Sequence, residues 1–541
     1  MRRIDNVALV SLGLLLGTTA CNPFLNDVAQ DPNRPTAASV SQLLVGMQAA
    51  QFALQEGTIA MEMCLWTQAC GATNGRFVQQ AYNYVFGEGT DIGSNGGDWA
   101  LIYDAGGLID LRQIEDIARA QGDNLSLGIA QAWEAFAIGT AADMWGNVPY
   151  SQALVSQTPA LDNQADVYAA VQAKLDSAIA NVAAGGPGPG ASDLVFGGNA
   201  GKWTRAIYTL KARYYLHTAE ALGNPAYDAA LAAAQNGISA QNGSEDWGPT
   251  HTTRTSERNM WTQFQTSSGF GNDLEAGKAL VDLMKGRADP RLAFYFCKNV
   301  TTPWQANHAY TVGTRILGSN GYAQRVTTAG TSGGTEPSWT AVPGDTKTDG
   351  TVVWTNDGLP YGGDDPSAAQ PNVSNFQCLP PRFDATARIP YVSYAENELI
   401  MAEALSSAAV NRTANFNDVL ALQHLNNARH YANAVFPAQP PLQPLPDLVG
   451  VTGAALLDSI MTEKYVAMFQ NIEIMSGYQR ECIPNLTPAS NNRGFTNVPA
   501  RLYYPLGERN ANPNIPDPST QNSTNGFRNP LDPHGCNGDA R

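Results

Sequence analysis

Residues 142–151 read ADMWGNVPYS, and this stretch decides how the rest of the chain is interpreted. It ends an amphipathic helix predicted over residues 130–144 and continues into an aromatic turn. Gly146 can adopt the backbone angles that end a helix, and Pro149 prevents the helix from resuming. Trp145 and Tyr150 should then pack back against the helix end. Taken alone, the stretch is equally compatible with a generic helix terminus.

Four further segments carry patterns that follow this stretch along the chain. Residues 162–182 have the apolar periodicity of an amphipathic helix. The later patterns are YAENELIMAEA at residues 394–404, IMTEKYVAMF at residues 460–469 and PARLYYP at residues 499–505. Ser393 and Glu396 read as a capping box that starts the second of these helices.

Glu396 and Glu403 lie on one face of the helix predicted at residues 394–404. Two carboxylates on one face are compatible with acid–base chemistry. A helix cap and a salt bridge between packed helices explain the same pair more simply. We therefore expect a structural role for both residues.

In this order, the five segments resemble the SusD/RagB family of nutrient-binding outer-membrane lipoproteins. The resemblance spans residues 31–510, although the early loops carry no strong match. It implies a mainly α fold of tetratricopeptide-like helical hairpins with long irregular loops. It also implies a non-catalytic protein without a cofactor, which captures oligosaccharide or polysaccharide and delivers it to a SusC-like TonB-dependent transporter. Capture of peptides or other nutrients is the alternative, followed by a glycan-degrading enzyme or an adhesin.

The composition excludes several classes of function. The chain has 541 residues, a formal net charge of −16 and only 15% charged residues. Nucleic-acid binding requires a basic surface, so we do not expect it. The six histidines form no HExxH pattern and the cysteines form no CxxC pair, so we expect no metal site. Residues 330–334 match G-x-S-x-G, but without the strand and helix that a nucleophile elbow needs.

The N-terminus has the pattern of a lipoprotein signal. A basic segment and a short apolar run precede the sequence TTAC at residues 18–21. We expect a signal peptide over residues 1–20, lipidation of Cys21 and a tether over residues 21–40. Together with the family resemblance, these features imply a protein anchored in the outer membrane and exposed at the cell surface. Ordinary secretion with a chance cysteine is the alternative.

Six cysteines remain in the predicted mature chain, and an even number in an exported protein favours disulfides. They are Cys64, Cys70, Cys297, Cys378, Cys482 and Cys536. Connectivity does not follow from the sequence. We expect pairing between successive cysteines, which would place one bridge at the base of residues 301–358.

Residues 301–358 differ in character from their surroundings. Helical periodicity stops there, and short β-type runs alternate with glycine-containing turns. The aromatic spacing resembles the small β-sandwich of chitin-binding-type modules and related modules of phage tail proteins. We expect an inserted carbohydrate-binding module, with a discontinuous helical domain over residues 41–300 and 359–541. Its candidate ligand contacts are Trp304, Tyr310, Tyr322, Trp339 and Trp354, although so small a domain also needs such rings for its core.

For the main binding site, the sequence offers two irregular segments rich in aromatic residues, 66–84 and 247–264. Loops on a rigid scaffold commonly carry binding residues. The candidate contacts are Asn74, Arg76, Phe77, Tyr82, Tyr84, Trp247, Asn259 and Trp261. The alternative is that tryptophans such as Trp66 and Trp261 belong to the core.

Overall fold

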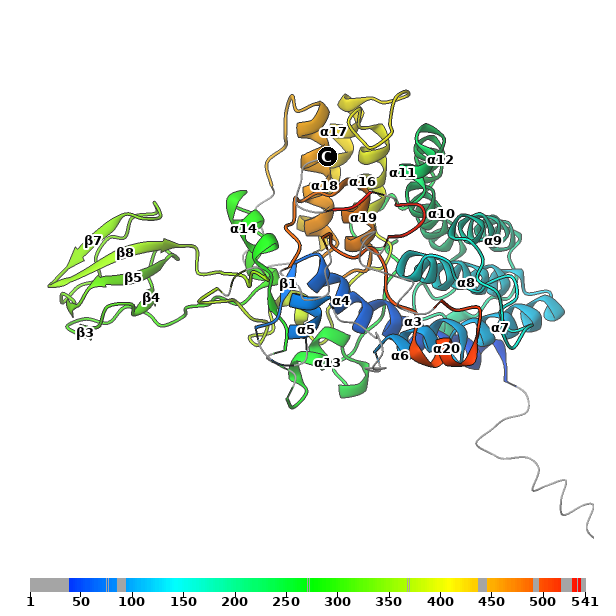
Figure 1. The fold of residues 1–541 in the computed structure, drawn as a ribbon, viewed down its shortest axis with the longest axis horizontal. Helices are drawn as coiled ribbons and strands as arrows, with labels where there is room; N and C mark the ends of the chain where they lie inside the picture. Colours follow the sequence, from blue (N-terminus) through cyan, green and yellow to red (C-terminus); the bar gives the residue numbers. More distant parts are fainter. Residues whose placement is uncertain are drawn as a thin grey trace, which may run out of the picture.

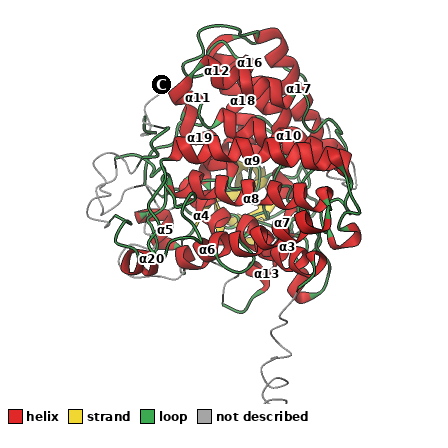
Figure 2. Ribbon diagram, turned by 90° about the vertical axis from the view of Figure 1, so that its right-hand side faces the viewer, coloured by secondary structure: helices red, strands yellow, loops and turns green. Residues whose placement is uncertain are grey.

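The computed structural model describes most of the chain. The described residues are 38–73, 75, 77–84, 94–269, 271, 273–366, 368, 370–435, 445–489, 496–516, 528–532 and 534–536. The predicted signal peptide, Cys21 and nearly all of the tether lie outside them. Helices predominate and the sheets are small, which confirms the predicted mainly α class (Figures 1 and 2).

The helical body is built from segments on both sides of residues 301–358. Its helices are α3 (Val40–Glu56), α4 (Thr58–Trp66), α5 (Val78–Asn83), α6 (Ser94–Tyr103), α7 (Leu108–Gln121), α8 (Asn124–Trp145), α9 (Gln164–Ala184), α10 (Ala200–Leu216), α11 (Ala219–Leu222), α12 (Asn224–Ala234), α13 (Met260–Thr266), α14 (Lys278–Gly286), α15 (Leu292–Tyr295), α16 (Tyr394–Leu405), α17 (Asp418–Val435), α18 (Gly453–Ala467), α19 (Glu473–Glu481) and α20 (Leu506–Ala511). Successive helices pack together, as in α7 with α8, α8 with α9 and α16 with α17.

The stretch at residues 142–151 forms the end of α8, which begins earlier than predicted, at Asn124. Gly146 ends the helix with a φ of 78°, in the region that favours glycine. The Trp145 indole donates to the Tyr503 carbonyl (3.0 Å), and the Tyr504 hydroxyl donates to the Asn147 carbonyl (2.6 Å). Two patterns far apart in the sequence therefore meet, and the aromatic turn fastens the C-terminal segment to α8.

Asp143 in this stretch has a structural role. Its carboxylate accepts from the Tyr168 hydroxyl of α9 and lies 2.7 Å from Nδ1 of His217, next to α10. Nε2 of His217 lies 2.9 Å from Glu473 of α19. Burial lowers the pKa of His217, but Asp143 and Glu473 outweigh it and raise this pKa to about 9. The imidazolium is thus charged at neutral pH and ties four helices together.

Glu396 and Glu403 are also structural, as expected. Glu396 accepts from Nη2 of Arg213 (2.7 Å), and its own backbone N–H donates to Ser393, the predicted helix cap. Glu403 accepts from Arg480 (3.0 Å) and from Lys464 (3.3 Å). All three pairs are buried, so losing one partner would leave an uncompensated charge inside the protein.

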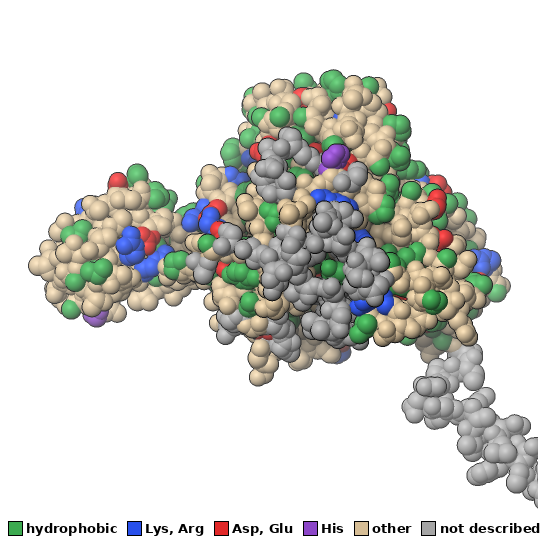
Figure 3. All heavy atoms as spheres, viewed as in Figure 1, with side chains coloured by type: hydrophobic (Ala, Val, Ile, Leu, Met, Phe, Trp, Pro, Cys, Tyr) green, Lys and Arg blue, Asp and Glu red, His purple; other side chains and the backbone are tan. Residues whose placement is uncertain are grey.

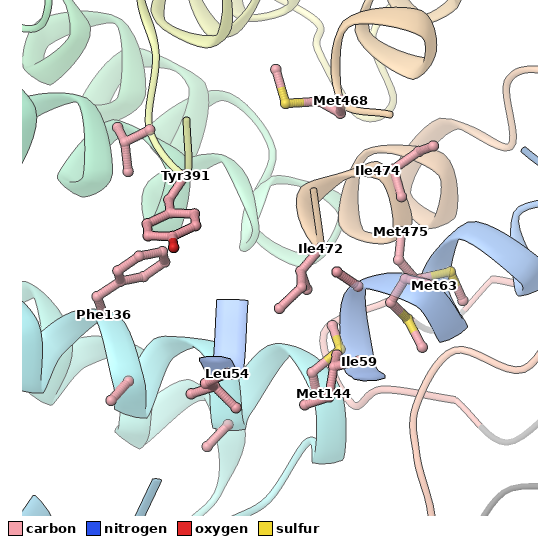
Figure 4. Close-up of a cluster of buried hydrophobic side chains, with 14 of the residues drawn as sticks. Leu54, Ile59, Met63, Phe136, Met144, Tyr391, Met468, Ile472, Ile474 and Met475 are labelled. Carbon is pink, nitrogen blue, oxygen red and sulfur yellow. The ribbon is translucent and has the colours of Figure 1, made fainter. Parts of the chain in front are cut away.

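The largest buried apolar cluster extends from α3 and α4 across α8 to α19 (Figure 4). Phe136 of α8 and Tyr391, in the segment before α16, face each other with ring centroids 6.2 Å apart. Met468 and Ile472 of the connection between α18 and α19 belong to the same cluster. This core holds the segment before α16 rigidly against the N-terminal helices.

Three disulfides are present: Cys64–Cys70, Cys297–Cys378 and Cys482–Cys536. The expected pairing of successive cysteines is confirmed. Cys64–Cys70 closes the end of α4 near strand β1 (Cys70–Gly71), which pairs with β2 (Glu275–Ala276). Cys297–Cys378 joins the segments on either side of residues 301–358.

The remaining strands project from the helical body at one end of the molecule (Figure 1). They are β3 (Ala309–Tyr310), β4 (Arg315–Leu317), β5 (Ala323–Thr328), β6 (Gly330–Thr331), β7 (Thr346–Asp349) and β8 (Val352–Gly358). The four-stranded antiparallel sheet has the order β4-β5-β8-β7, and β3 pairs with β6. Along β8 the side chains alternate between buried and partly buried, as in a strand with one covered face.

On the face in Figure 3, charged side chains are scattered among a majority of other atoms, in keeping with the low charged fraction. Across the described ranges, the helices are too short or too polar for any of them to cross a membrane.

Candidate ligand cavity

A cavity of about 350 Å³ lies in the helical body. Its wall is formed by the loop after α12, by α15, by the segments before and at the start of α16, by α17 and by the end of α18. Small-molecule sites commonly measure about 300–1,000 Å³. The cavity is therefore large enough for a small ligand or for the end of a longer one.

Arg382 and Tyr295 form part of the cavity wall. Arg382 donates to the Phe469 carbonyl (2.6 Å) and to Oε1 of Gln470 (2.9 Å). Its guanidinium also lies 4.8 Å from the centre of the Tyr295 ring. Burial lowers the pKa of Arg382, because the charged form is poorly solvated there. The group nevertheless stays protonated at neutral pH.

Arg291, in the same wall, is held by two acids. Its Nη1 lies 2.7 Å from Glu463, and its Nη2 lies 2.7 Å from Asp289. Two carboxylates therefore bind this guanidinium, and both also bind Arg287. The Tyr295 hydroxyl donates to the Val466 carbonyl (3.0 Å), which fixes α15 against α18.

Asp246 is the acidic residue among those that line the cavity. It accepts from the Tyr394 backbone N–H (2.9 Å) and from the Tyr431 hydroxyl. Burial raises the pKa of Asp246 to about 6, although both hydrogen bonds oppose this rise. Asp246 therefore changes charge around pH 6.

Backbone pairing holds the two segments that carry these residues together. The Trp247 N–H donates to the Val392 carbonyl (2.9 Å), and the Tyr391 N–H donates to the Trp247 carbonyl (2.7 Å). Arg388 crosses the same junction and donates to the Asp246 carbonyl (2.6 Å) and the Pro249 carbonyl (3.2 Å). Arg388 and Asn242 are the exposed members of the wall, so they mark the mouth of the cavity.

The cavity combines guanidinium, phenol, amide and carboxylate groups with the apolar side chain of Met468. Such a lining can hold a polar ligand by hydrogen bonds while an apolar surface packs on it. Over the part of the chain that the structure describes, no group of three or more His, Cys, Asp or Glu is arranged to hold a metal ion.

The described candidates of the first irregular segment, Phe77, Tyr82 and Tyr84, do not line this cavity. Asn74 and Arg76 are outside the described residues. Phe77 and Tyr84 are buried: Phe77 packs on Phe264, and Tyr84 packs edge-on against Trp66. Tyr82 is only partly buried, and its hydroxyl donates to Asp364 (2.8 Å).

The candidates of the second irregular segment are core residues, which corrects the expectation of ligand contact. Trp247 and Trp261 are 0% exposed. Trp247 lies edge-on to Trp133 and Trp203, with centroids 4.6 and 4.8 Å away. Asn259 is the N-cap of α13 and accepts from the Trp261 N–H (2.9 Å). Surrounding helices cover these side chains completely, so a ligand cannot reach them in this structure.

Of the five aromatic candidates in the inserted strands, some are buried and others are only partly buried. Tyr310 and Trp354 are buried and form the small core with Ile316, Val326 and Val352, so these two are corrected to core residues. Trp304 and Trp339 are partly buried and pack against that core from its edge. Tyr322 is partly buried and is not a member of that cluster.

Reasoning from the sequence missed the residues that line the cavity. Asp246, Arg382, Arg388 and Tyr431 come from separate segments and share no spacing. The available signal was indirect, since Ser393 and Ala395 belong to a recognised helix start and also line the cavity.

Successive helices pack in pairs, and the cavity between them has both polar and apolar lining residues. Comparison with known proteins assigns this fold to a family. The SusD-like family, described as starch-binding and associating with the outer membrane, matches residues 32–505. The chain therefore belongs to the SusD-like family. Members of this family are generally non-catalytic binding proteins.

Solved structures share the fold along almost the whole chain. A SusD homologue from Bacteroides fragilis has a TM-score of 0.64 and 15% identity, covering 93% of this chain and 100% of that chain. A SusD/RagB family protein from Bacteroides thetaiotaomicron has a TM-score of 0.60 and 20% identity, covering 91% and 97%. A chitin-binding SusD homologue from Flavobacterium johnsoniae has a TM-score of 0.58 and 16% identity, covering 92% and 98%. No curated protein matches the chain.

Proposed function

We propose that this protein is a surface lipoprotein that captures oligosaccharide without cleaving it and delivers it to a SusC-like TonB-dependent transporter. The observation that carries the proposal is the cavity of about 350 Å³, with its guanidinium, phenol and amide lining, in a SusD-like scaffold. Sugar hydroxyls both donate and accept hydrogen bonds, so they match such a mixed lining. Two similar structures are of proteins described as chitin-binding, which supports a glycan ligand.

Residues 301–358 form a second glycan-binding unit in this proposal, inserted between the two parts of the helical domain at 41–300 and 359–541. Trp304, Tyr322 and Trp339 are the ring candidates, because they are only partly buried. An aromatic face can stack on the C–H groups of a sugar ring. Two weak sites on one chain raise the overall affinity for a polymer through effective concentration.

The N-terminal part of the proposal is a signal peptide over residues 1–20 and a lipid on Cys21, which would hold the protein at the outer membrane. In the first irregular segment, Tyr82 stays a candidate contact because its ring is only partly buried. Asn74 and Arg76 stay candidates on the sequence alone.

Isothermal calorimetry or a glycan array tests the proposal on the soluble chain that lacks residues 1–21. A second version carries a short linker in place of residues 301–358. We expect binding to at least one polysaccharide, no new reducing ends, and weaker binding after the replacement. If no glycan binds, the proposal is wrong.

Peptide capture is the second candidate, because the guanidinium groups of Arg382 and Arg388 also suit the carboxylate at the end of a peptide. The same calorimeter distinguishes the two. Peptides that bind with a free C-terminus but not as the amide, together with no glycan binding, would favour this candidate.

A further inference from the structure

The charges around the cavity are unequal. Three guanidinium groups line it, those of Arg291, Arg382 and Arg388, against one carboxylate, that of Asp246. The whole chain has the opposite balance, with a formal net charge of −16. A concentration of positive charge inside an acidic protein indicates a local function for that charge.

Arg291 does not account for this excess, because Asp289 and Glu463 bind it. Arg388 is different. It donates to the carbonyls of Asp246, Gly248 and Pro249, and within the described ranges it forms no salt bridge. The hydrogen-bond acceptors of this charge at the mouth are therefore neutral, and the charge also acts on the buried Asp246 carboxylate.

Arg382 adds a second charge, deeper in the wall. The acceptors at 2.6 and 2.9 Å, the Phe469 carbonyl and Oε1 of Gln470, are neutral. Burial lowers the pKa of Arg382, which means that the surroundings stabilise its charged form less than water does. An anion placed in the cavity would restore part of that lost stabilisation.

We propose that the cavity binds a sugar that carries a carboxylate, that is, a uronic acid unit of an acidic glycan. This inference rests on the proposed function, since it names the class of glycan. Arg388 and Arg382 would attract the carboxylate, and the phenols and amides around them would bind the hydroxyl groups. Arginine suits this role because its planar donors match a carboxylate in pairs.

Asp246 makes this binding depend on pH. The groups that face it are the hydroxyl of Tyr431, the N–H of Tyr394, the charge of Arg388 and, as a like charge, Glu245. The pKa of Asp246 is raised to about 6, so its charge is present at pH 8 and largely absent at pH 5. A uronate stays ionised at both pH values, because carboxylic acids titrate near pH 4. Affinity should therefore increase as the pH falls from 8 to 5.

The test is calorimetry on the full chain solubilised in detergent, with oligoglucuronate and the matched neutral glucose oligomer as ligands. We expect the acidic oligomer to bind at least about tenfold more tightly, the value of one charge-assisted hydrogen bond. Arg388→Gln should remove roughly three- to tenfold of that affinity, and Arg388→Lys should retain only part of it, because lysine keeps the charge but not the paired planar donors. Arg119→Gln is the matched control, because Arg119 is exposed on α7 and does not line the cavity.

Asp246→Asn gives a readout that a purely structural role would not produce. It should tighten oligoglucuronate binding at pH 8 and flatten the difference between pH 5 and pH 8. Asparagine can keep one hydrogen bond to the Tyr394 N–H, and circular dichroism at both pH values verifies the fold.

The outcomes separate this inference from the proposed function. Equal affinity for the acidic and the neutral oligomer overturns the inference and leaves glycan capture intact. Binding of succinate as tight as that of oligoglucuronate also overturns it, since the sugar would then contribute nothing. Binding of peptides with no glycan binding overturns both.

Discussion

The helical body and the inserted strands differ in how far they bury their aromatic residues. Trp247 and Trp261 of the body are 0% exposed, whereas Trp304 and Trp339 beside the small sheet stay partly exposed. The body surrounds each ring with several helices, but the inserted unit has a core of only five residues. A small unit cannot cover all its large side chains. In the helical body, an aromatic-rich segment therefore indicates residues of the core. In the insertion, some aromatic rings remain exposed enough to contact a ligand.

Trp247→Ala tests whether this ring belongs to the core of the helical body. Loss of its contacts with Trp133, Trp203 and Phe136 should lower the free energy of unfolding by about 3–5 kcal/mol. Urea denaturation followed by circular dichroism measures this loss. Phe416→Ala is the control, because Phe416 is 50% exposed and its loss should cost about 0.5 kcal/mol or less. A cost below about 1 kcal/mol for Trp247 would contradict its place in the core.

Trp354→Ala should act more locally. Trp354 contacts Tyr310 and Trp339 at 4.8 and 5.8 Å, so its loss should cost the insertion about 3 kcal/mol. A unit with a core of five residues is too small to stay folded after this loss of stability. The strands should therefore unfold while the helices stay folded. Hydrogen exchange measured by mass spectrometry should then show fast exchange over residues 309–358 alone.

The matched control for that variant is Val342→Ala, since Val342 is exposed beside the same sheet. It should leave exchange in residues 309–358 unchanged. Faster exchange in α14 or α16 after Trp354→Ala would show that the insertion and the body unfold together. That result would remove the physical basis of the comparison.

The sequence predicted the fold well where local patterns and long-range contacts agree. The turn at residues 142–151 is an example, because Gly146 ends α8 as expected. Trp145 differs from the expectation, since it contacts Trp99 of α6 and the Tyr503 carbonyl. Glu396 and Glu403 form the expected salt bridges, since a helix seldom carries buried acids without basic partners. The end of α8 and the shared helix face of the two acids depend on spacing within one helix, which a sequence displays directly. Their partners, such as Arg213, Arg480 and Tyr503, lie on other segments.

The candidate site was harder to predict for a physical reason. Asp246 and Arg388 meet because Trp247 pairs with Val392, a contact between segments more than a hundred residues apart. The periodicity of apolar residues in a sequence does not reveal a contact between such distant segments. Trp247 itself attracted attention because it is aromatic in an irregular segment, but its backbone, and not its ring, shapes the cavity wall.

Tyr322→Ala tests whether a partly buried ring of the insertion contacts the ligand. Tyr322 is partly buried, and its backbone is held by Asn320 and Gly318, so removal of the ring should leave the fold intact. If the ring stacks on a sugar, polysaccharide affinity should fall by about 1 kcal/mol, or roughly fivefold. Calorimetry with a polysaccharide that binds the unmodified chain measures the change.

Tyr322→Phe separates the ring from its hydroxyl. The phenylalanine keeps a flat apolar face, so affinity should stay within about twofold of the original if stacking is the source. An equal loss in both variants would assign the contact to the hydroxyl. No loss in either variant, with hydrogen exchange unchanged over residues 309–358, would mean that partial exposure of a ring does not predict ligand contact in this insertion. The contrast with the buried rings of the body would then describe packing alone.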